Sequence, residues 1–218
     1  MIRSARECIG EIALGLLPVV TIIWVTPLLF REREAFLQAN FYLSLLAFVI
    51  AAASNLRHRD TLKTLGVRLD NFSSALRLLA LPTAIAGLVI VAIGLAADSL
   101  ALGDRFFFHL RTLPPWALLQ QYALQGFVHR RLQDAYGRGR KSILGTALVF
   151  SLLHLPNPVL TVGTFIGGAV WAWVFSQQPN LFALALSHTL VSALLANALP
   201  RSLLQNMKVG WGYWGQVP

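Results

Sequence analysis

Three groups of side chains that could do chemistry interrupt long apolar runs in the second half of the chain. In chain order they are Gln120, Gln121 and Gln125, then Phe150 and His154, then His188 and Ser192. Within each group, a four-residue spacing puts two members on one face of a helix. Polar side chains in a membrane are costly unless they have partners, so these residues are functional candidates.

Each group also has a structural interpretation. Amides can bond across helices and hold a bundle together, at about 0.6 kcal/mol per interaction on average. A histidine in a membrane helix is a stronger functional candidate, because its charge can change near neutral pH. His58, His109 and His129 lie in or beside polar gaps. We expect these three to be solvated surface residues.

The composition indicates an integral membrane protein. Of the 218 residues, 56% are hydrophobic and only 12% are charged, whereas soluble domains carry about 25% charged residues. The net charge of +9 could suggest a nucleic-acid partner. The basic residues, however, lie in short gaps between apolar runs, which argues against nucleic-acid binding. The single cysteine, Cys8, excludes an intramolecular disulfide.

Seven apolar runs predict an all-α polytopic bundle of about seven membrane spans. They cover Ile12 to Phe30, Phe36 to Leu56, Ala75 to Ala97, Pro114 to Leu132, Ser142 to Leu155, Leu160 to Phe175 and Leu181 to Leu199. The first run resembles a signal peptide, but charged residues follow it in place of a small-residue cleavage site. We therefore expect a retained first span.

The remaining segments divide the chain into three parts. Residues 1–113 hold the N-terminal spans and a basic, mildly amphipathic segment from Arg57 to Ser74, which we expect at the membrane interface. Residues 114–199 form a core, and residues 200–218 form a tail with aromatic residues suited to the headgroup layer. Gly163 and Gly167, with Gly168 beside them, predict close helix packing in the sixth run.

The Lys and Arg distribution predicts the orientation. With seven spans, twelve of the eighteen basic residues fall on the side of the N-terminus, including a group from Arg130 to Lys141. We interpret that group as an orientation signal. The positive-inside rule places this side in the cytoplasm, so Gln120 and His154 lie toward the opposite face. We expect a bacterial inner membrane location.

The order and spacing of the three groups resemble the motifs of the CPBP intramembrane proteases, also called the ABI family, which includes the type II CAAX prenyl endopeptidases. The family's Glu-Glu-x-x-x-Arg motif, usually continuing Gly-Phe, is matched by "QQYALQGF" from Gln120. Its Phe-x-x-x-His motif is matched by "FSLLH" from Phe150, and its His-x-x-x-Asn/Asp motif by "HTLVS" from His188. The similarity covers roughly Pro114 to Leu199.

The resemblance implies roles for these residues. The family's first glutamate and second-motif histidine are thought to activate water, which assigns that role to Gln120 and His154. The third-motif pair is thought to stabilise the oxyanion, which assigns that role to His188 and Ser192. Gln121 and Gln125 stand at the positions of the second glutamate and the arginine.

The first motif departs from the family pattern in all its charged positions. A glutamine cannot act as a general base near pH 7, although it keeps the shape and hydrogen-bonding reach of glutamate. The joint replacement of both carboxylates and the arginine keeps the site electrically neutral. Asp98 or Asp104 could fold over the site from a neighbouring gap. Two histidines without a carboxylate or thiolate make a poor zinc site, and we expect no metal and no cofactor.

Two functions remain open. The first is an intramembrane endopeptidase that acts on a membrane-embedded or lipidated protein, with His154 as the remaining base. The second is a catalytically impaired relative that binds a membrane partner without cutting it, as a processing or immunity factor. We therefore expect membrane lipid and a membrane-embedded or lipidated protein as partners, and no nucleic acid.

Overall fold

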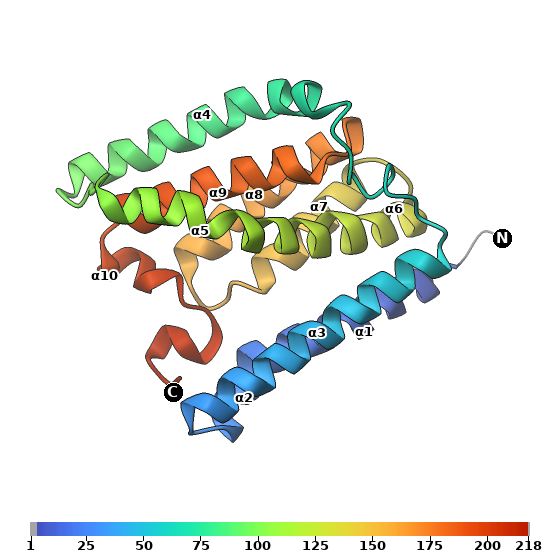
Figure 1. Cartoon of the computed structure of the whole chain (residues 1–218), viewed down its shortest axis with the longest axis horizontal. Coiled ribbons are helices and arrows are strands. Elements are labelled where there is room, and N and C mark those ends of the chain that lie inside the picture. The colour runs from blue at the N-terminus through green and yellow to red at the C-terminus, as the bar shows by residue number, and fades with distance from the viewer. Residues whose placement is uncertain (1–3, 218) are drawn as a thin grey trace.

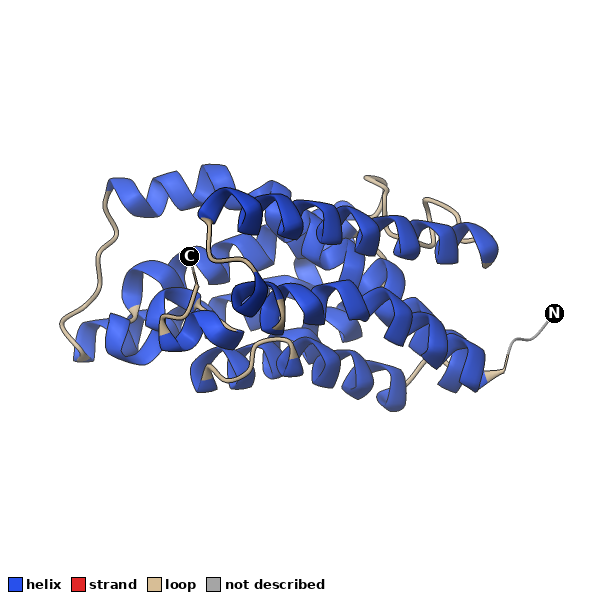
Figure 2. Cartoon of the chain, turned by 90° about the horizontal axis from the view of Figure 1, so that it is seen from below, coloured by secondary structure: helices blue, strands red, loops and turns tan. Residues whose placement is uncertain are grey.

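The fold is an all-helical bundle in the computed structural model, which describes residues 4–217 (Figure 1). Only helices and connecting loops are seen in this range, as Figure 2 also shows. The elements are α1 (Ala5–Trp24), α2 (Thr26–Leu29), α3 (Arg33–Arg57), α4 (Phe72–Ala96), α5 (Asp104–Gln121), η1 (Tyr122–His129), α6 (Arg130–Tyr136), α7 (Arg140–Leu152), α8 (Pro158–Gln177), α9 (Leu181–Ala198), α10 (Arg201–Leu204), η2 (Gln205–Met207) and η3 (Gly210–Trp214). The predicted fold class is confirmed.

Five of these helices are long and apolar enough to cross a membrane, namely α1, α3, α4, α8 and α9. The chain is therefore a multi-pass membrane protein. The predicted fourth span corresponds to α5, η1 and α6, which follow one another directly. The predicted fifth span corresponds to α7, whose 13 residues fall short of the ~20 that a perpendicular span needs. A total of seven spans stays a prediction.

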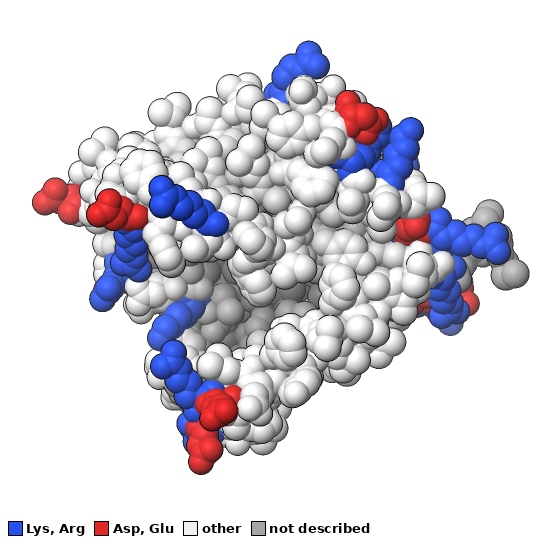
Figure 3. Space-filling model, viewed as in Figure 1, with Lys and Arg blue, Asp and Glu red and all other residues white. Residues whose placement is uncertain are grey.

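The helices run alternately between two ends of the molecule (Figure 1). The start of α1, the α3–α4 loop and the loop after α6 lie at one end, which we call the proximal end. The α4–α5 loop and the C-terminal tail lie at the other, which we call the distal end. Charged side chains gather toward these two ends, and an uncharged band separates them on the face in Figure 3. This pattern is typical of a bundle that spans a bilayer.

Helix α9 forms the centre of the bundle. In its most apolar stretch 61% of the residues are buried, against 6% in α3. It packs against α4 and α5, while α7 pairs with α8 and α1 with α3. The largest buried cluster joins α4, η1, α7, α8 and α9 through residues such as Leu79, Leu124, Phe150 and Trp171. The central helix thus carries the third motif, and α3 leaves its large apolar side chains for lipid.

The glycine spacing in α8 contributes less than predicted. A Cβ added at Gly163 would meet nothing within 4 Å, and one at Gly167 would meet only Trp171 of the same helix. At Gly168, a Cβ would lie 3.2 Å from Ala147 Cα and 3.3 Å from Phe150 Cδ1. The prediction of close packing is therefore wrong for Gly163 and Gly167. Of the three glycines, only Gly168 faces α7, because it lies about 100° from Gly167 and about 140° from Gly163 around the helix.

The C-terminal tail folds back onto α1. The indole nitrogen of Trp211 donates a hydrogen bond to the Trp24 carbonyl over 2.9 Å, and both rings contact Trp214. Trp24 lies at the end of α1, so this aromatic cluster lies at the distal end, as expected for an interfacial tail. Within the predicted interfacial segment from Arg57 to Ser74, residues 58–71 form turns between α3 and α4, and residues 72–74 begin α4.

A buried charge cluster fixes the α3–α4 loop to α6 at the proximal end. Asp60 pairs with Arg130 at 2.7 Å and also with Arg131, whose side chain is fully buried. Burial raises the pKa of the Asp60 carboxyl, while the hydrogen bond from Arg130 opposes that shift. Buried charges need such partners. Arg130 and Arg131 therefore have a structural role beyond the predicted orientation signal.

The solvated placement predicted for two histidines is wrong. The His58 side chain is 8% exposed and lies 3.0 Å from carboxylate oxygens of both Glu11 and Asp134. His129 is fully buried, with Nδ1 2.7 Å from the Thr146 hydroxyl. Sequence gaps that look polar can fold inward when other elements supply the missing hydrogen bonds. His109 is half-buried, with Nδ1 2.8 Å from the Asn197 side-chain amide.

Candidate functional site

The three motifs lie on four adjoining elements. Gln120 and Gln121 end α5, and Gln125 lies in η1, a π-helix of eight residues. Phe150 lies near the end of α7 and His154 in the turn that follows, while His188 and Ser192 lie on α9. A π-helix is rare and often occurs at functional sites. Its wider turn still leaves Gln121 and Gln125 on nearly the same face.

Phe150 joins the two motif histidines. Its ring makes edge-to-face contacts with His154, at a centroid distance of 4.8 Å, and with His188, at 6.1 Å. Trp171 of α8 covers the other side of His188, with ring centroids 4.5 Å apart. The second and third motifs are therefore brought together by an aromatic cluster.

The two histidines present different nitrogen atoms to the site. His154 Nδ1 lies 2.7 Å from the Phe150 carbonyl. A carbonyl only accepts, so Nδ1 carries the proton and Nε2 keeps a free lone pair. His188 Nδ1 lies 3.2 Å from Gln121 Nε2, and an amide nitrogen only donates. His188 Nδ1 is then the acceptor, and Nε2 carries the proton.

The buried amides of the first motif are only partly satisfied. Gln121 and Gln125 are both fully buried. Among the described residues, the Gln121 carbonyl oxygen and both polar atoms of Gln125 have no hydrogen-bond partner. A buried polar atom without a partner costs about 1–3 kcal/mol. Such atoms mark a place where a polar group of a substrate could complete the bonding.

Gln120 and Ser192 remain more open. Both are half-buried, and neither has a hydrogen bond within the described part of the chain. Gln120 faces about 100° away from Gln121 on the helix. His154 and His188 thus lie on either end of a cluster with Phe150. That Gln120 lines one cavity with these two histidines stays a prediction. The two cavities found at the ends of the molecule do not include motif residues.

Acidic side chains lie away from the motifs. Asp98 and Asp104 flank the α4–α5 loop, are exposed, and form no ion pair within residues 4–217. Their closure over the site is thus not seen. Within the same range, no group of three His, Cys, Asp or Glu residues could hold a metal ion.

Several supporting contacts were not predicted. The Ser187 hydroxyl lies 3.1 Å from the Trp171 indole nitrogen and 2.8 Å from the Thr83 hydroxyl of α4. These bonds orient the indole that covers His188. Trp171 lies between the second and third motifs, and no spacing rule connects it with His188. The Gln121–His188 contact was also missed, because the family roles pair His188 with Ser192.

Fold and motifs together define a multi-pass helical membrane protein with a three-motif histidine site. Residues 105–194 match a family model described as type II CAAX prenyl endopeptidase Rce1-like. This match confirms the resemblance to the CPBP and CAAX-protease-like family over the segment that carries all three motifs. No curated protein and no solved structure matches the chain.

Proposed function

We propose that the protein is an intramembrane endopeptidase that cuts a membrane-embedded or lipidated protein. The proposal rests on the two histidine tautomers. His154 offers a lone pair on Nε2, as a general base requires, while His188 offers an N–H on Nε2, as an oxyanion donor requires. The family match supports the same class of chemistry. The hollowed, uncharged face in Figure 3 supports lateral access for a membrane segment.

Each step of the proposed reaction keeps its atoms and charges balanced. His154 Nε2 takes a proton from a water molecule as the water oxygen bonds to the scissile carbonyl carbon. The carbonyl oxygen becomes an oxyanion, to which His188 Nε2–H donates. Collapse breaks the C–N bond, and the His154 imidazolium returns its proton to the leaving amine. The products are a new carboxyl group and a new amino group.

The amides have positioning roles in this scheme. Gln121 holds the His188 tautomer through the 3.2 Å hydrogen bond. Gln120, with its unpartnered amide, orients the water molecule, and Ser192 adds a hydroxyl donor near the oxyanion. Gln125 contributes polar atoms to the neutral interior where an arginine would otherwise be expected. A neutral network avoids the large cost of an unpaired buried charge.

The second candidate is a relative that binds a membrane partner without cutting it. It is favoured by one observation, namely that the amides replace both carboxylates and no Asp or Glu side chain bonds to a motif residue within residues 4–217. In this case the neutral cavity would hold a polar group of the partner. We expect charge in the cavity to weaken such binding.

One experiment separates the two functions. Cleavage of a membrane-peptide library and partner pull-down are measured side by side for wild type, Gln120→Glu, and Gln120→Glu with Gln125→Arg. For a protease, Gln120→Glu should raise cleavage at high pH, because burial among amides raises the carboxyl pKa. Adding Gln125→Arg should move that gain toward neutral pH. If neither the wild type nor either variant cleaves, and both variants pull down less partner than the wild type, the binding function is the correct one.

We also propose that the protein lies in a bacterial inner membrane with its N-terminus in the cytoplasm. The excess of Lys and Arg in the segments at the proximal end supports this orientation by the positive-inside rule. Arg3, which belongs to the sequence-based count, lies outside the described residues. The motif histidines then face the distal half of the bilayer.

A further inference from the structure

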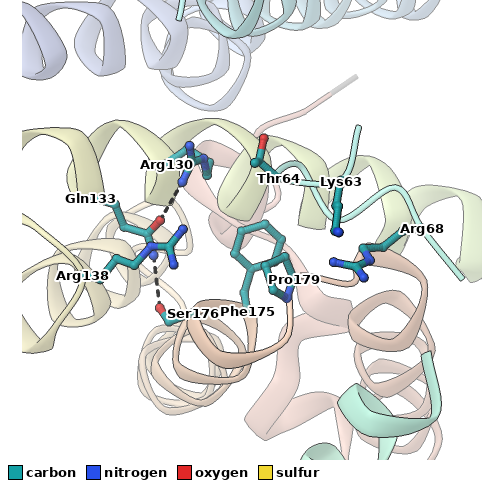
Figure 4. Close-up of a pocket in the computed structure, with 9 residues that line it drawn as sticks. All are labelled: Lys63, Thr64, Arg68, Arg130, Gln133, Arg138, Phe175, Ser176 and Pro179. Atoms are coloured by element: carbon teal, nitrogen blue, oxygen red, sulfur yellow. Dashed lines mark hydrogen bonds between the residues drawn. The ribbon is translucent and has the colours of Figure 1, made fainter. Parts of the chain in front are cut away.

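A basic cavity lies at the proximal end, away from the motif histidines. It has a volume of about 200 Å³ and is lined by Lys63, Thr64, Arg68, Arg130, Gln133, Arg138, Phe175, Ser176 and Pro179. Figure 4 shows Lys63 and Arg68 on one side and Gln133 and Arg138 on the other, with the rings of Phe175 and Pro179 between them. The walls thus come from the α3–α4 loop, from α6 and the loop after it, and from the end of α8.

Four cationic side chains line this cavity, and only two of them form ion pairs within residues 4–217. Arg68 pairs with Asp70, and Arg130 pairs with Asp60. Lys63 and Arg138 have no ion-pair partner within residues 4–217. The cavity therefore holds an excess of positive charge that an anion would offset.

The polar floor of the cavity is built and held in place. Gln133 is only 8% exposed, and its side-chain oxygen accepts from Arg130 at 3.1 Å. Its nitrogen donates to His129 Nε2 at 2.9 Å and to the Ser176 hydroxyl at 3.2 Å. The fully buried His129 thus fixes Gln133, which in turn fixes Ser176 and Arg130. These bonds use the donors of Gln133 within the protein, so the floor is rigid, and a rigid wall lowers the entropic cost of ordering the cavity around a ligand.

The cavity also has an apolar wall. Phe175 belongs to the largest buried cluster, and Pro179 follows the end of α8. A purely ionic ligand gains nothing from this wall, whereas an ester carrying carbon atoms can pack against it. The location at the charged end of the bundle corresponds to the headgroup layer of the bilayer.

We propose that this cavity binds a phosphate ester anion, with the phosphate between Lys63 and Arg138 and the ester carbons against Phe175. The charge supplied by Lys63 and Arg138 attracts the anion. The headgroup of an anionic phospholipid carries this chemistry. The site is separate from the motif histidines, so it is independent of the proposed proteolysis.

The test uses the full chain in a neutral detergent. Three probes are titrated, namely short-chain phosphatidylglycerol, phosphatidylcholine of the same chain length, and inorganic phosphate, and dissociation constants and Tm are recorded. We expect phosphatidylglycerol to bind and to raise Tm. Lys63→Gln with Arg138→Gln should weaken that binding roughly 30-fold, because each basic group contributes about 1 kcal/mol to an anionic headgroup contact.

The matched control is Arg140→Gln with Lys141→Gln. These two cations are exposed at the same end but do not line the cavity, so binding should stay close to wild type. The lining cations also face the end of α8, where they offset the helix dipole. If Lys63 and Arg138 had only that structural role, their double variant would have a lower Tm than wild type by the same amount with and without phosphatidylglycerol.

The three probes also test the role of the ester carbons. Tighter binding of phosphatidylglycerol than of inorganic phosphate supports a lipid headgroup, and equal binding of inorganic phosphate would overturn the proposed phosphate ester. The proposal is overturned if no probe binds, if phosphatidylcholine binds as well as phosphatidylglycerol, or if both double variants lose the same affinity.

Discussion

At the scale of single residues, the buried amides are the unusual feature of this protein. Gln121 uses its nitrogen on His188, while Gln125 uses neither polar atom within the described range. Both side chains are fully buried. The contrast between one bonded and one unbonded amide on the same helical face leads to a direct comparison of their energies.

Gln125→Met should stabilise the protein. The substitution keeps a similar side-chain volume and removes two buried polar atoms that lack partners. Each such atom lowers the stability of the folded protein by about 1–3 kcal/mol. Gln121→Met should stabilise less or destabilise, because it also breaks the hydrogen bond to His188. Thermal unfolding in detergent measures both. A lower Tm for Gln125→Met would contradict this account and would indicate a bound water or another partner at Gln125.

Single-residue contacts were the part that the sequence could predict least. The four-residue spacings placed Phe150 with His154 correctly, because that contact is local to one turn. The partner of His188 depends on how α5 and α9 pack, which no local pattern specifies. The burial of His129 depends in the same way on Thr146 and Ser176, which belong to distant elements.

At the scale of elements, Gly168 lies where α8 packs most closely against α7. Gly168→Val should destabilise the protein by about 1–3 kcal/mol, because a side chain there would press into the Ala147 backbone. Gly163→Val on the same helix should change little, since nothing lies within 4 Å of its Cβ position. Unfolding of both variants in detergent provides the measurement. Equal losses of stability would show that the α8 face has been assigned wrongly.

The α3–α4 loop gives a second comparison at this scale. Asp60→Asn should lower the free energy of unfolding by about 3–5 kcal/mol, because it removes the carboxylate that pairs with both Arg130 and the fully buried Arg131. Asp70→Asn removes an ion pair in the same loop, but the Asp70 side chain is 65% exposed, so we expect a loss of about 0–1 kcal/mol. Chemical unfolding of the two variants tests the difference. Similar values for both would argue against a buried ionic anchor.

The positions of the long helices were predicted well, but the change from α-helical to π-helical geometry in η1 was not. Apolar runs of sufficient length identify α1, α3, α4, α8 and α9 because lipid demands them. The π-helical turn of η1 has no such requirement. It arises where the packing of neighbouring helices outweighs regular α geometry, and the sequence from Tyr122 to His129 contains no proline or other local signal for it.

At the scale of the whole molecule, the alternating course of the chain fixes which loops share an end. The loop after α6, which contains Arg138, and the C-terminal tail, which contains Trp214, lie at opposite ends (Figure 1). In a Cys8→Ala background, a cysteine at position 138 should react with an impermeant maleimide only after cells are opened. A cysteine at position 214 should react in intact spheroplasts. Labelling of both positions from the same side would contradict the arrangement.

The most direct test of the account is the effect of His154→Ala on cleavage of a membrane peptide. We expect a loss of about 10²–10⁴ in rate, because general-base assistance is worth that much. His109→Ala is the control, since His109 is a half-buried histidine that bonds to Asn197 and not to the motifs; its rate should stay near wild type. Wild-type cleavage that survives His154→Ala, or falls equally with His109→Ala, would contradict the assignment of His154 as the catalytic base.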